Sequence, residues 1–355
     1  KLMPRVVLLL SVLSFGAFVA TYLFEFSYSY FVAYLLFYVI YLLNSLEFWG
    51  VSAISFDVRQ SKRLFGIISM GDIPAKLLGY MTVPLFVAVF PIDFLYFLAL
   101  SAFIASYLSL KKLLKHTHLH VEKDHKISTP RVLAQKKFTK KYILQIAVLS
   151  GSAVFAVTFI NFSFLAEVKR SYGSEAELAM FLGTFFSFGK AITIVYKIFF
   201  AGRFTEKYGI KRNLLIFPLA LLFVCGTIAF FNFFFPENLY ILYLIGIMML
   251  LVEVVKKAIH EPVFLALFQP LNRHDRLRGH AIVKGIAEPL FMILASGILL
   301  LLMKKNARVD LVTINYVLLA TLMVWLVVVV VVNRSYFNNL LLAFEKRIGG
   351  LQHLH

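Results

Sequence analysis

The sequence predicts an all-α integral membrane protein with about ten transmembrane helices. Of its 355 residues, 61% are hydrophobic and only 15% are charged, whereas soluble domains are about 45–50% apolar and about 25% charged. The mean hydropathy is +0.84. Ten apolar runs are each long enough to cross a bilayer, which takes about 20 helical residues. None of them alternates polar and apolar residues as a membrane strand does.

Each apolar run is expected to be helical because backbone N–H and C=O groups in lipid must pair within their own segment. Prolines inside the runs predict kinks, since Pro cannot donate a backbone hydrogen bond; these are Pro74, Pro84, Pro218, Pro262 and Pro289. The predicted spans are 6–24, 30–54, 65–90, 92–110, 142–168, 177–202, 212–235, 238–267, 279–302 and 311–332.

The formal net charge of +18 is concentrated in alternate loops between the spans. Cationic loops remain in the cytoplasm, so these loops, including the stretch from Lys111 to Lys141, are predicted to be cytoplasmic. Topology and attraction to anionic lipid headgroups explain the charge. The expected partner is therefore the lipid bilayer, and no nucleic acid is expected.

The basic stretch 111–141 is interpreted as a cytoplasmic linker that divides the chain into two helical parts. The predicted parts are a partial N-terminal half over 1–110, a six-helix C-terminal half over 142–335 and a cytoplasmic tail over 336–355. Arg63-Leu-x-Gly followed by Gly71-Asp-Ile-Pro is echoed by Arg276-Leu-x-Gly followed by Gly285-Ile-Ala-Glu-Pro. Two such copies entering from the same side indicate a parallel repeat.

The segment from Gly202 to Arg212 resembles the Gly-x-x-x-Asp-Arg-x-Gly-Arg-Lys loop of the major facilitator superfamily, with Glu206 in the place of Asp. In that family the loop joins the second and third helices of each six-helix half. The resemblance implies a major-facilitator-type bundle of which helices three to twelve are present here, and a charge latch that involves Glu206 and Arg212.

Two further segments resemble the ATP/ADP translocase family of bacteria and plastids, and most nearly its divergent bacterial branch. They are Phe48-Trp-Gly with Ser61-Lys-Arg-Leu-Phe65, and Lys256-Lys257 running to Glu261-Pro262. The resemblance implies a secondary transporter of the bacterial inner membrane that exchanges anionic solutes such as nucleotides by alternating access. Some members carry a soluble domain, which is a possible fused partner here.

Charged residues inside the spans are candidate substrate ligands, because each costs about 2.5–3.5 kcal/mol at mid-bilayer. Lys190 and Lys197 share one helical face with Gly183, Ser187 and Thr193. No acidic residue lies at helical spacing from either lysine, so both are predicted to face a cavity and attract an anion. Glu253 and Lys257 at i,i+4, together with Glu47, complete the expected substrate-binding set.

Two more acid–base pairs at i,i+4 lie near the cytoplasmic ends of spans and are expected to act in gating or as static latches: Asp72 with Lys76, and Lys284 with Glu288.

No motif supports catalysis, a cofactor or a metal, and the chain is not expected to be an enzyme. The sequence has neither a phosphate-binding loop nor a nucleophile elbow. Two alternatives to transport of an anion stay open. One is a membrane sensor or anchor that passes a signal to a C-terminal soluble regulatory domain, and the other is a transporter of the same fold for an unrelated solute.

Overall fold

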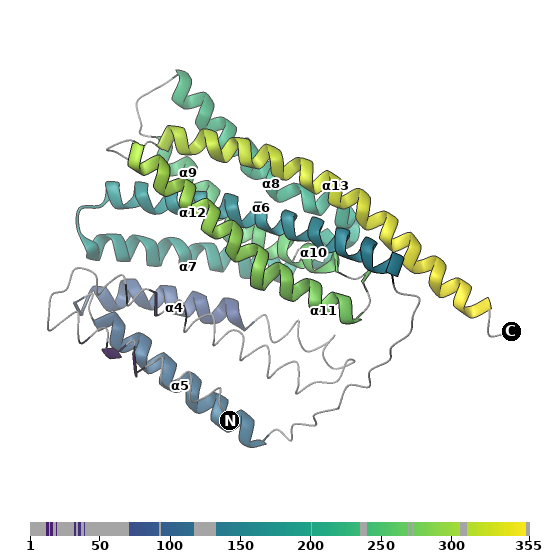
Figure 1. Cartoon of the computed structure of the whole chain (residues 1–355). Helices are drawn as coiled ribbons and strands as arrows, with labels where there is room; N and C mark the ends of the chain where they lie inside the picture. Colours follow the sequence, from purple (N-terminus) through teal and green to yellow (C-terminus); the bar gives the residue numbers. More distant parts are fainter. Residues whose placement is uncertain are drawn as a thin grey trace. The chain divides into compact units, whose positions relative to one another are not determined.

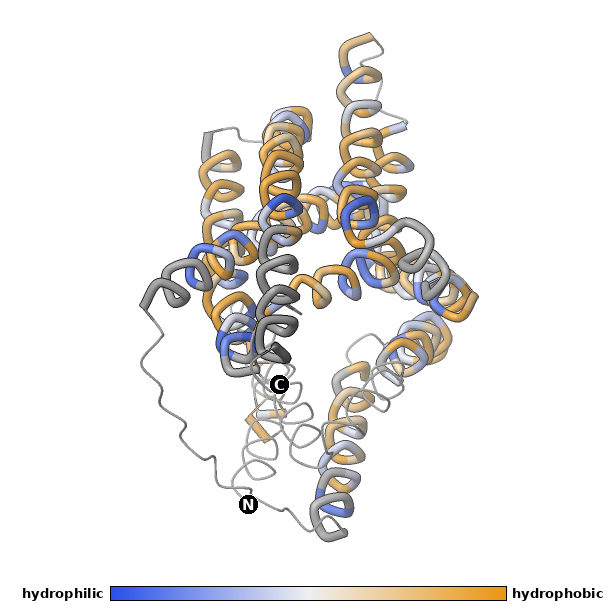
Figure 2. The backbone as a smooth tube through the Cα atoms, turned by 90° about the vertical axis from the view of Figure 1, so that its right-hand side faces the viewer, coloured by the Kyte–Doolittle hydropathy of each residue, from blue (hydrophilic) through white to orange (hydrophobic). Residues whose placement is uncertain are grey.

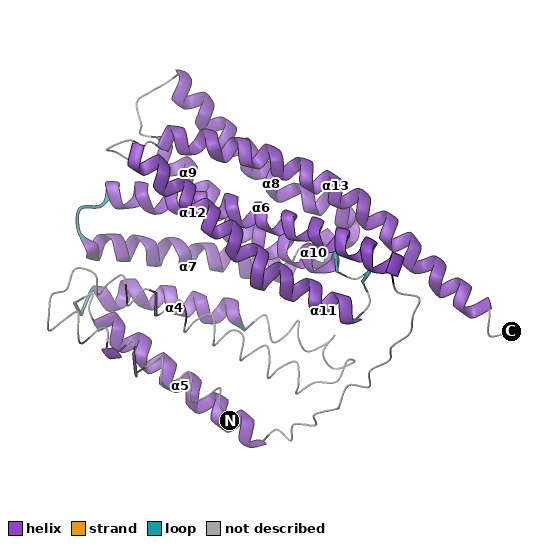
Figure 3. Cartoon of the chain, in the orientation of Figure 1, coloured by secondary structure: helices purple, strands orange, loops and turns teal. Residues whose placement is uncertain are grey.

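The computed structural model describes residues 71–91, 94–116, 133–199, 201–234, 240–268, 270–271, 273–305 and 311–352, with scattered residues between 12 and 39. Most of the predicted spans 6–24 and 30–54, including Glu47, lie outside these residues. Throughout the described part the regular structure is helical and contains no strand (Figure 1, Figure 3). The all-α prediction is confirmed for that part of the chain.

Five described helices are long and apolar enough to cross a membrane, and they coincide with five predicted spans. They cover Lys140–Ser171, Glu175–Phe199, Gly209–Phe234, Arg278–Met303 and Leu311–Phe337. Hydrophobic residues dominate their length in Figure 2. The first three and the last lie in α6 (Leu133–Ser171), α7 (Glu175–Phe199), α8 (Ala201–Phe234) and α13 (Leu311–Gln352). The span Arg278–Met303 begins in α11 (Arg273–Ile282) and continues into α12 (Glu288–Lys305).

The predicted number of ten spans is not reached in the described residues. Beside the five long helices, the described part has two shorter apolar ones, within α4 (Asp72–Val87) and α5 (Leu95–His116). The predicted span 238–267 is helical but interrupted. Helices α5 and α6 also extend into the predicted linker 111–141 from its two ends.

Two π-helical segments interrupt the helices that carry most of the intramembrane charge. The first, η3 (Val252–His260), joins α9 (Ile241–Leu251) to α10 (Glu261–Ala266). The second, η4 (Val283–Ala287), joins α11 (Arg273–Ile282) to α12. Each ends directly before a Glu-Pro pair. A proline ring clashes with the carbonyl four residues earlier, and widening the turn relieves the clash. At Pro262 and Pro289 the predicted kinks therefore take the form of π turns.

The chain forms two compact units, Lys1–Ile127 with Glu175–Thr184, and Ser128–Ser174 with Phe185–His355. Within the first, Gly183 of α7 lies against α4. A Cβ atom at Gly183 would lie 2.7 Å from Pro84 Cδ and 3.0 Å from the Tyr80 carbonyl oxygen. Glycine is therefore what permits this close packing of the two helices.

Within the second unit, α6 packs against α9, α12 and α13. Its inward face is apolar, with Ile146, Leu149, Phe159 and Ile160 fully buried. Leu, Ile and Phe at spacings of three and four place this stripe on one face of the helix. The second unit thus has a central helix that fixes the positions of its neighbours.

Gly209 separates a first short turn of α8 from its membrane-spanning part. Its φ of 67° and ψ of 172° are non-helical, and that region of backbone conformation is accessible almost only to glycine. The glycine thus lets the chain change direction where the sequence predicted a tight loop between two spans.

We expect Gly209→Ala to lower the free energy of unfolding by about 1–3 kcal/mol, because a Cβ atom strains this backbone conformation. Thermal or chemical unfolding of the purified protein in detergent measures the change. Gly226→Ala is the matched control. Gly226 is also in α8, but it is helical and has open space around its Cα, so alanine there should be neutral or stabilising. Equal effects of the two variants would contradict the assignment.

Candidate functional site

A cluster of charged side chains forms where η3 meets α7. Glu253 of η3 is 7% exposed and Lys190 of α7 is 1% exposed. The Lys190 ammonium donates a hydrogen bond to Glu253 Oε2. Lys257, one turn further along η3, donates to both carboxylate oxygens, at 3.0 Å to Oε1 and 2.8 Å to Oε2. One carboxylate therefore binds two lysines.

Small residues let α7 approach η3 closely enough for these contacts. A Cβ atom at Gly189 would lie 3.4 Å from Glu253 Cβ. The hydroxyl of Thr193 lies 2.7 Å from the Gly189 carbonyl oxygen and 3.0 Å from the Glu253 carbonyl oxygen. Gly189 and Thr193 thus hold the backbone of α7 beside the carboxylate that pairs with Lys190.

Two ammonium groups, those of Lys190 and Lys257, thus surround the one carboxylate of Glu253. A buried charge is costly unless it is paired, and the almost fully buried Lys190 has its pair in Glu253. Lys257 is the more accessible of the two, with a side chain 26% exposed. The arrangement can therefore accept an anion beside Lys257 while Lys190 stays shielded.

A second charged group surrounds the junction of η4 and α12. Lys284 lies 2.7 Å from Glu288 as an i,i+4 pair, and Ser150 of α6 donates to the Glu288 carboxylate at 2.5 Å. The Lys284 ammonium also lies 5.6 Å from the centre of the Phe264 ring. Lys256 of η3 interacts electrostatically with Lys284 and Glu288, so the two charged groups are neighbours.

Lys190 has no acid at helical spacing along α7, but it does have an acidic partner from elsewhere in the chain. Its partner Glu253 comes from a different helix, 63 residues further along the chain, and spacing along α7 cannot indicate such a contact. The middle of the polar stripe on α7, at Lys190 and Thr193, packs against η3. Lys197 lies two turns further along α7 and is partly exposed.

Several other predicted site residues belong to the first unit or lie outside the described side chains. Glu47 is not among the described residues, and nothing is described of the side chains of Asp72 and Glu206. Lys76 is partly buried on α4, and Arg212 is exposed on α8.

Two residues that sequence reasoning missed shape the charged groups. Ser150 bonds Glu288 across 138 residues of chain, and Gly189 permits the approach of η3. The sequence alone does not indicate either role, because a serine or a glycine in an apolar span is more often a packing residue. Small residues do occur preferentially where membrane helices approach one another closely.

In the part of the chain that the structure describes, helices long enough to span a membrane surround a buried cluster of charged side chains. Residues 80–336 match the family model described as the TLC ATP/ADP transporter. That range covers more than half of the chain, and the protein belongs to this family of membrane transporters. The family's members are transporters and not enzymes. No individual curated protein matches the chain.

We expect Glu253→Gln to destabilise the protein more than Lys190→Met does. The substitution removes the carboxylate to which both lysines donate, and removing one partner of a buried pair costs about 3–5 kcal/mol. Losing Lys190 leaves Glu253 still paired with Lys257. Thermal unfolding in detergent measures both variants.

Lys141→Met serves as the control for these variants, since Lys141 is exposed at the start of α6 and should tolerate the change. If Lys190→Met proved as damaging as Glu253→Gln, Lys257 would not be compensating the carboxylate.

Proposed function

We propose that this protein exchanges nucleotides or closely related phosphorylated anions across a membrane by alternating access. The observation that carries the proposal is the Lys190–Glu253–Lys257 cluster, in which a buried carboxylate serves two lysines. Membership of the TLC ATP/ADP transporter family supports a phosphorylated substrate. A phosphate group can accept hydrogen bonds from the partly exposed Lys257 ammonium, and charge-assisted hydrogen bonds to phosphate are among the stronger ones.

In this proposal the substrate phosphate competes with Glu253 for Lys257. The partly exposed Lys257 ammonium meets the anion first, and Glu253 then stays paired with Lys190. The exchange conserves the number of charge-assisted hydrogen bonds, so entry of the anion leaves no buried ammonium unpaired. Lys197 and Glu47 are proposed to extend the binding site.

The acid–base pairs outside the cluster are proposed to re-partner between inward-open and outward-open states. The Lys284–Glu288 contact, with the Ser150 hydroxyl bound to the same carboxylate, supports this role. Both π turns lie in the helices that carry such pairs, and π turns are frequent at functional sites. Asp72 with Lys76, and Glu206 with Arg212, are the corresponding proposed pairs elsewhere in the chain.

At the level of the fold, we propose a major-facilitator-type bundle with helices three to twelve of twelve, and with halves at 1–110 and 142–335. The protein would lie in a bacterial inner membrane as part of the divergent bacterial branch, with 111–141 and 336–355 in the cytoplasm. The Arg-Leu-x-Gly repeat and the positively charged loops support this arrangement.

Uptake of radiolabelled ATP, ADP and phosphate into proteoliposomes tests the substrate. We expect saturable uptake that is stimulated by unlabelled nucleotide inside the vesicles. Lys257→Gln should reduce it about tenfold to a hundredfold, because a hydrogen bond between charged groups is worth about 1.5–3 kcal/mol.

Lys141→Gln removes an exposed lysine near the start of α6 and should leave uptake unchanged. Correctly inserted protein that takes up none of the three compounds would rule out the phosphorylated substrate. Uptake that survives Lys257→Gln at the wild-type rate would place the anion elsewhere.

A further inference from the structure

Glu167 is a buried carboxylate that the transport cluster does not use. It lies on α6 inside the span Lys140–Ser171 and is 7% exposed. Its Oε2 atom has no hydrogen-bond partner among the described residues. A carboxylate left ionised and unpaired in such a place costs several kcal/mol, so Glu167 requires a proton or a cation that neutralises it.

The described ionisable groups that neighbouring elements carry at this end of α6 make no ion pair with Glu167. On α6 itself, Lys169 and Arg170 are exposed. Tyr240 just before α9, Tyr243 in α9 and Tyr316 in α13 are also exposed. The sequence also has Lys304 and Lys305 at the end of α12 and Arg308 before α13, and their side chains are outside the described part of the structure.

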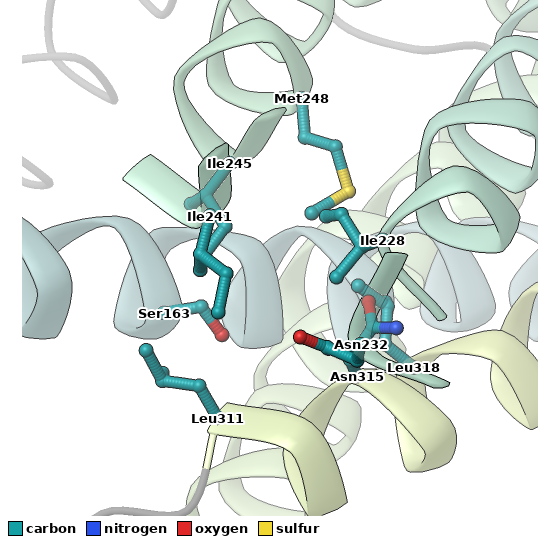
Figure 4. Close-up of a pocket in the computed structure, with 9 residues that line it drawn as sticks. All are labelled: Ser163, Ile228, Asn232, Ile241, Ile245, Met248, Leu311, Asn315 and Leu318. Atoms are coloured by element: carbon teal, nitrogen blue, oxygen red, sulfur yellow. The ribbon is translucent and has the colours of Figure 1, made fainter. Parts of the chain in front are cut away.

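A small pocket lies one helical turn away from Glu167. It lies between α6, α8, α9 and α13. Ser163, four residues before Glu167 and so on the same face of α6, lines it with Asn232 and Asn315, and the rest of the wall is apolar (Figure 4). In Figure 4 the oxygen atoms of the Ser163 and Asn315 side chains point toward one another across the pocket.

The orientation of Asn315 is fixed by α8. Its Nδ2 donates to the Cys225 carbonyl oxygen at 3.2 Å, a contact that only the amide nitrogen can make. Its Oδ1 atom accepts only the weak Cys225 thiol donor, at 3.1 Å. The amide oxygen therefore keeps a lone pair available. Ser163 and Asn315 thus bring two side-chain oxygens to the pocket, and Glu167 follows Ser163 one turn further along the same face of α6.

We propose that Glu167, Ser163 and Asn315 form a binding site for a monovalent cation, sodium or a proton, that moves with the substrate. A single carboxylate balances one positive charge, and neutral hydroxyl and amide oxygens complete an oxygen shell of the kind that hard cations prefer. Cation binding does not depend on the proposed nucleotide exchange, whereas coupling of the cation to substrate movement rests on it.

Thermal unfolding of the full chain in detergent tests the binding step. Sodium chloride is titrated against choline chloride at constant ionic strength, and a second series varies pH in choline chloride alone. Glu167→Gln keeps the shape of the side chain and removes its charge. The control Glu175→Gln changes an exposed carboxylate at the start of α7.

If sodium is the ligand, it should raise the melting temperature of the wild type and of Glu175→Gln by a few degrees, and Glu167→Gln should not respond. If a proton is the ligand, sodium should have no effect. Raising the pH should then destabilise the wild type but not Glu167→Gln, since deprotonation leaves a buried charge. A Glu167→Gln variant that responds to both series as the wild type does would overturn the proposal.

Uptake in proteoliposomes then tests coupling. We expect an imposed inward gradient of the cation identified by melting to accelerate wild-type uptake several-fold, and to have no effect on Glu167→Gln. Exchange without a gradient should persist in that variant. A protein that binds the cation but transports no phosphorylated anion would refute only the proposed function. If the gradient accelerated uptake by Glu167→Gln as much as uptake by the wild type, only the coupling would be refuted.

Discussion

The packing of this transporter depends on compensating charge where water is absent. Glu253 does this for two lysines at once, one from its own helix and one from α7. Because Lys190 is almost completely buried, α7 can lie against η3 only while that carboxylate is present. The glycine at 189 and the hydroxyl of Thr193 serve the same contact, since they bring the two backbones within reach.

The same constraint explains why the charged residues lie where the helices are irregular. The segments η3 and η4 carry Glu253, Lys257 and Lys284, and each ends at a Glu-Pro pair. Proline loosens the backbone, and the charged side chains then reach partners on α6 and α7. In the described part of the chain, the long regular helices α6 and α13 supply the apolar walls around these segments.

Membrane spans were predictable from the sequence because an uninterrupted run of about 20 apolar residues is typical of a transmembrane helix and rare in soluble proteins. The i,i+4 pairs Glu253–Lys257 and Lys284–Glu288 were also predictable, since helical spacing alone brings such side chains together. Contacts such as Lys190–Glu253 and Ser150–Glu288 were not, because they join residues far apart in the chain. Glu167 Oε2 lacks a hydrogen-bond partner because the described parts of the neighbouring helices place no donor beside it. The local sequence around Glu167 contains no information about that.

The two π turns have a consequence for how the helices could have arisen and could move. A π turn holds one residue more than an α turn, so it is the trace that a single-residue insertion leaves in a regular helix. Sliding that extra residue along the helix by one turn would rotate the intervening side chains by about 100°. Glu253 and Lys257 would then turn together toward a different neighbour while the helix kept its length.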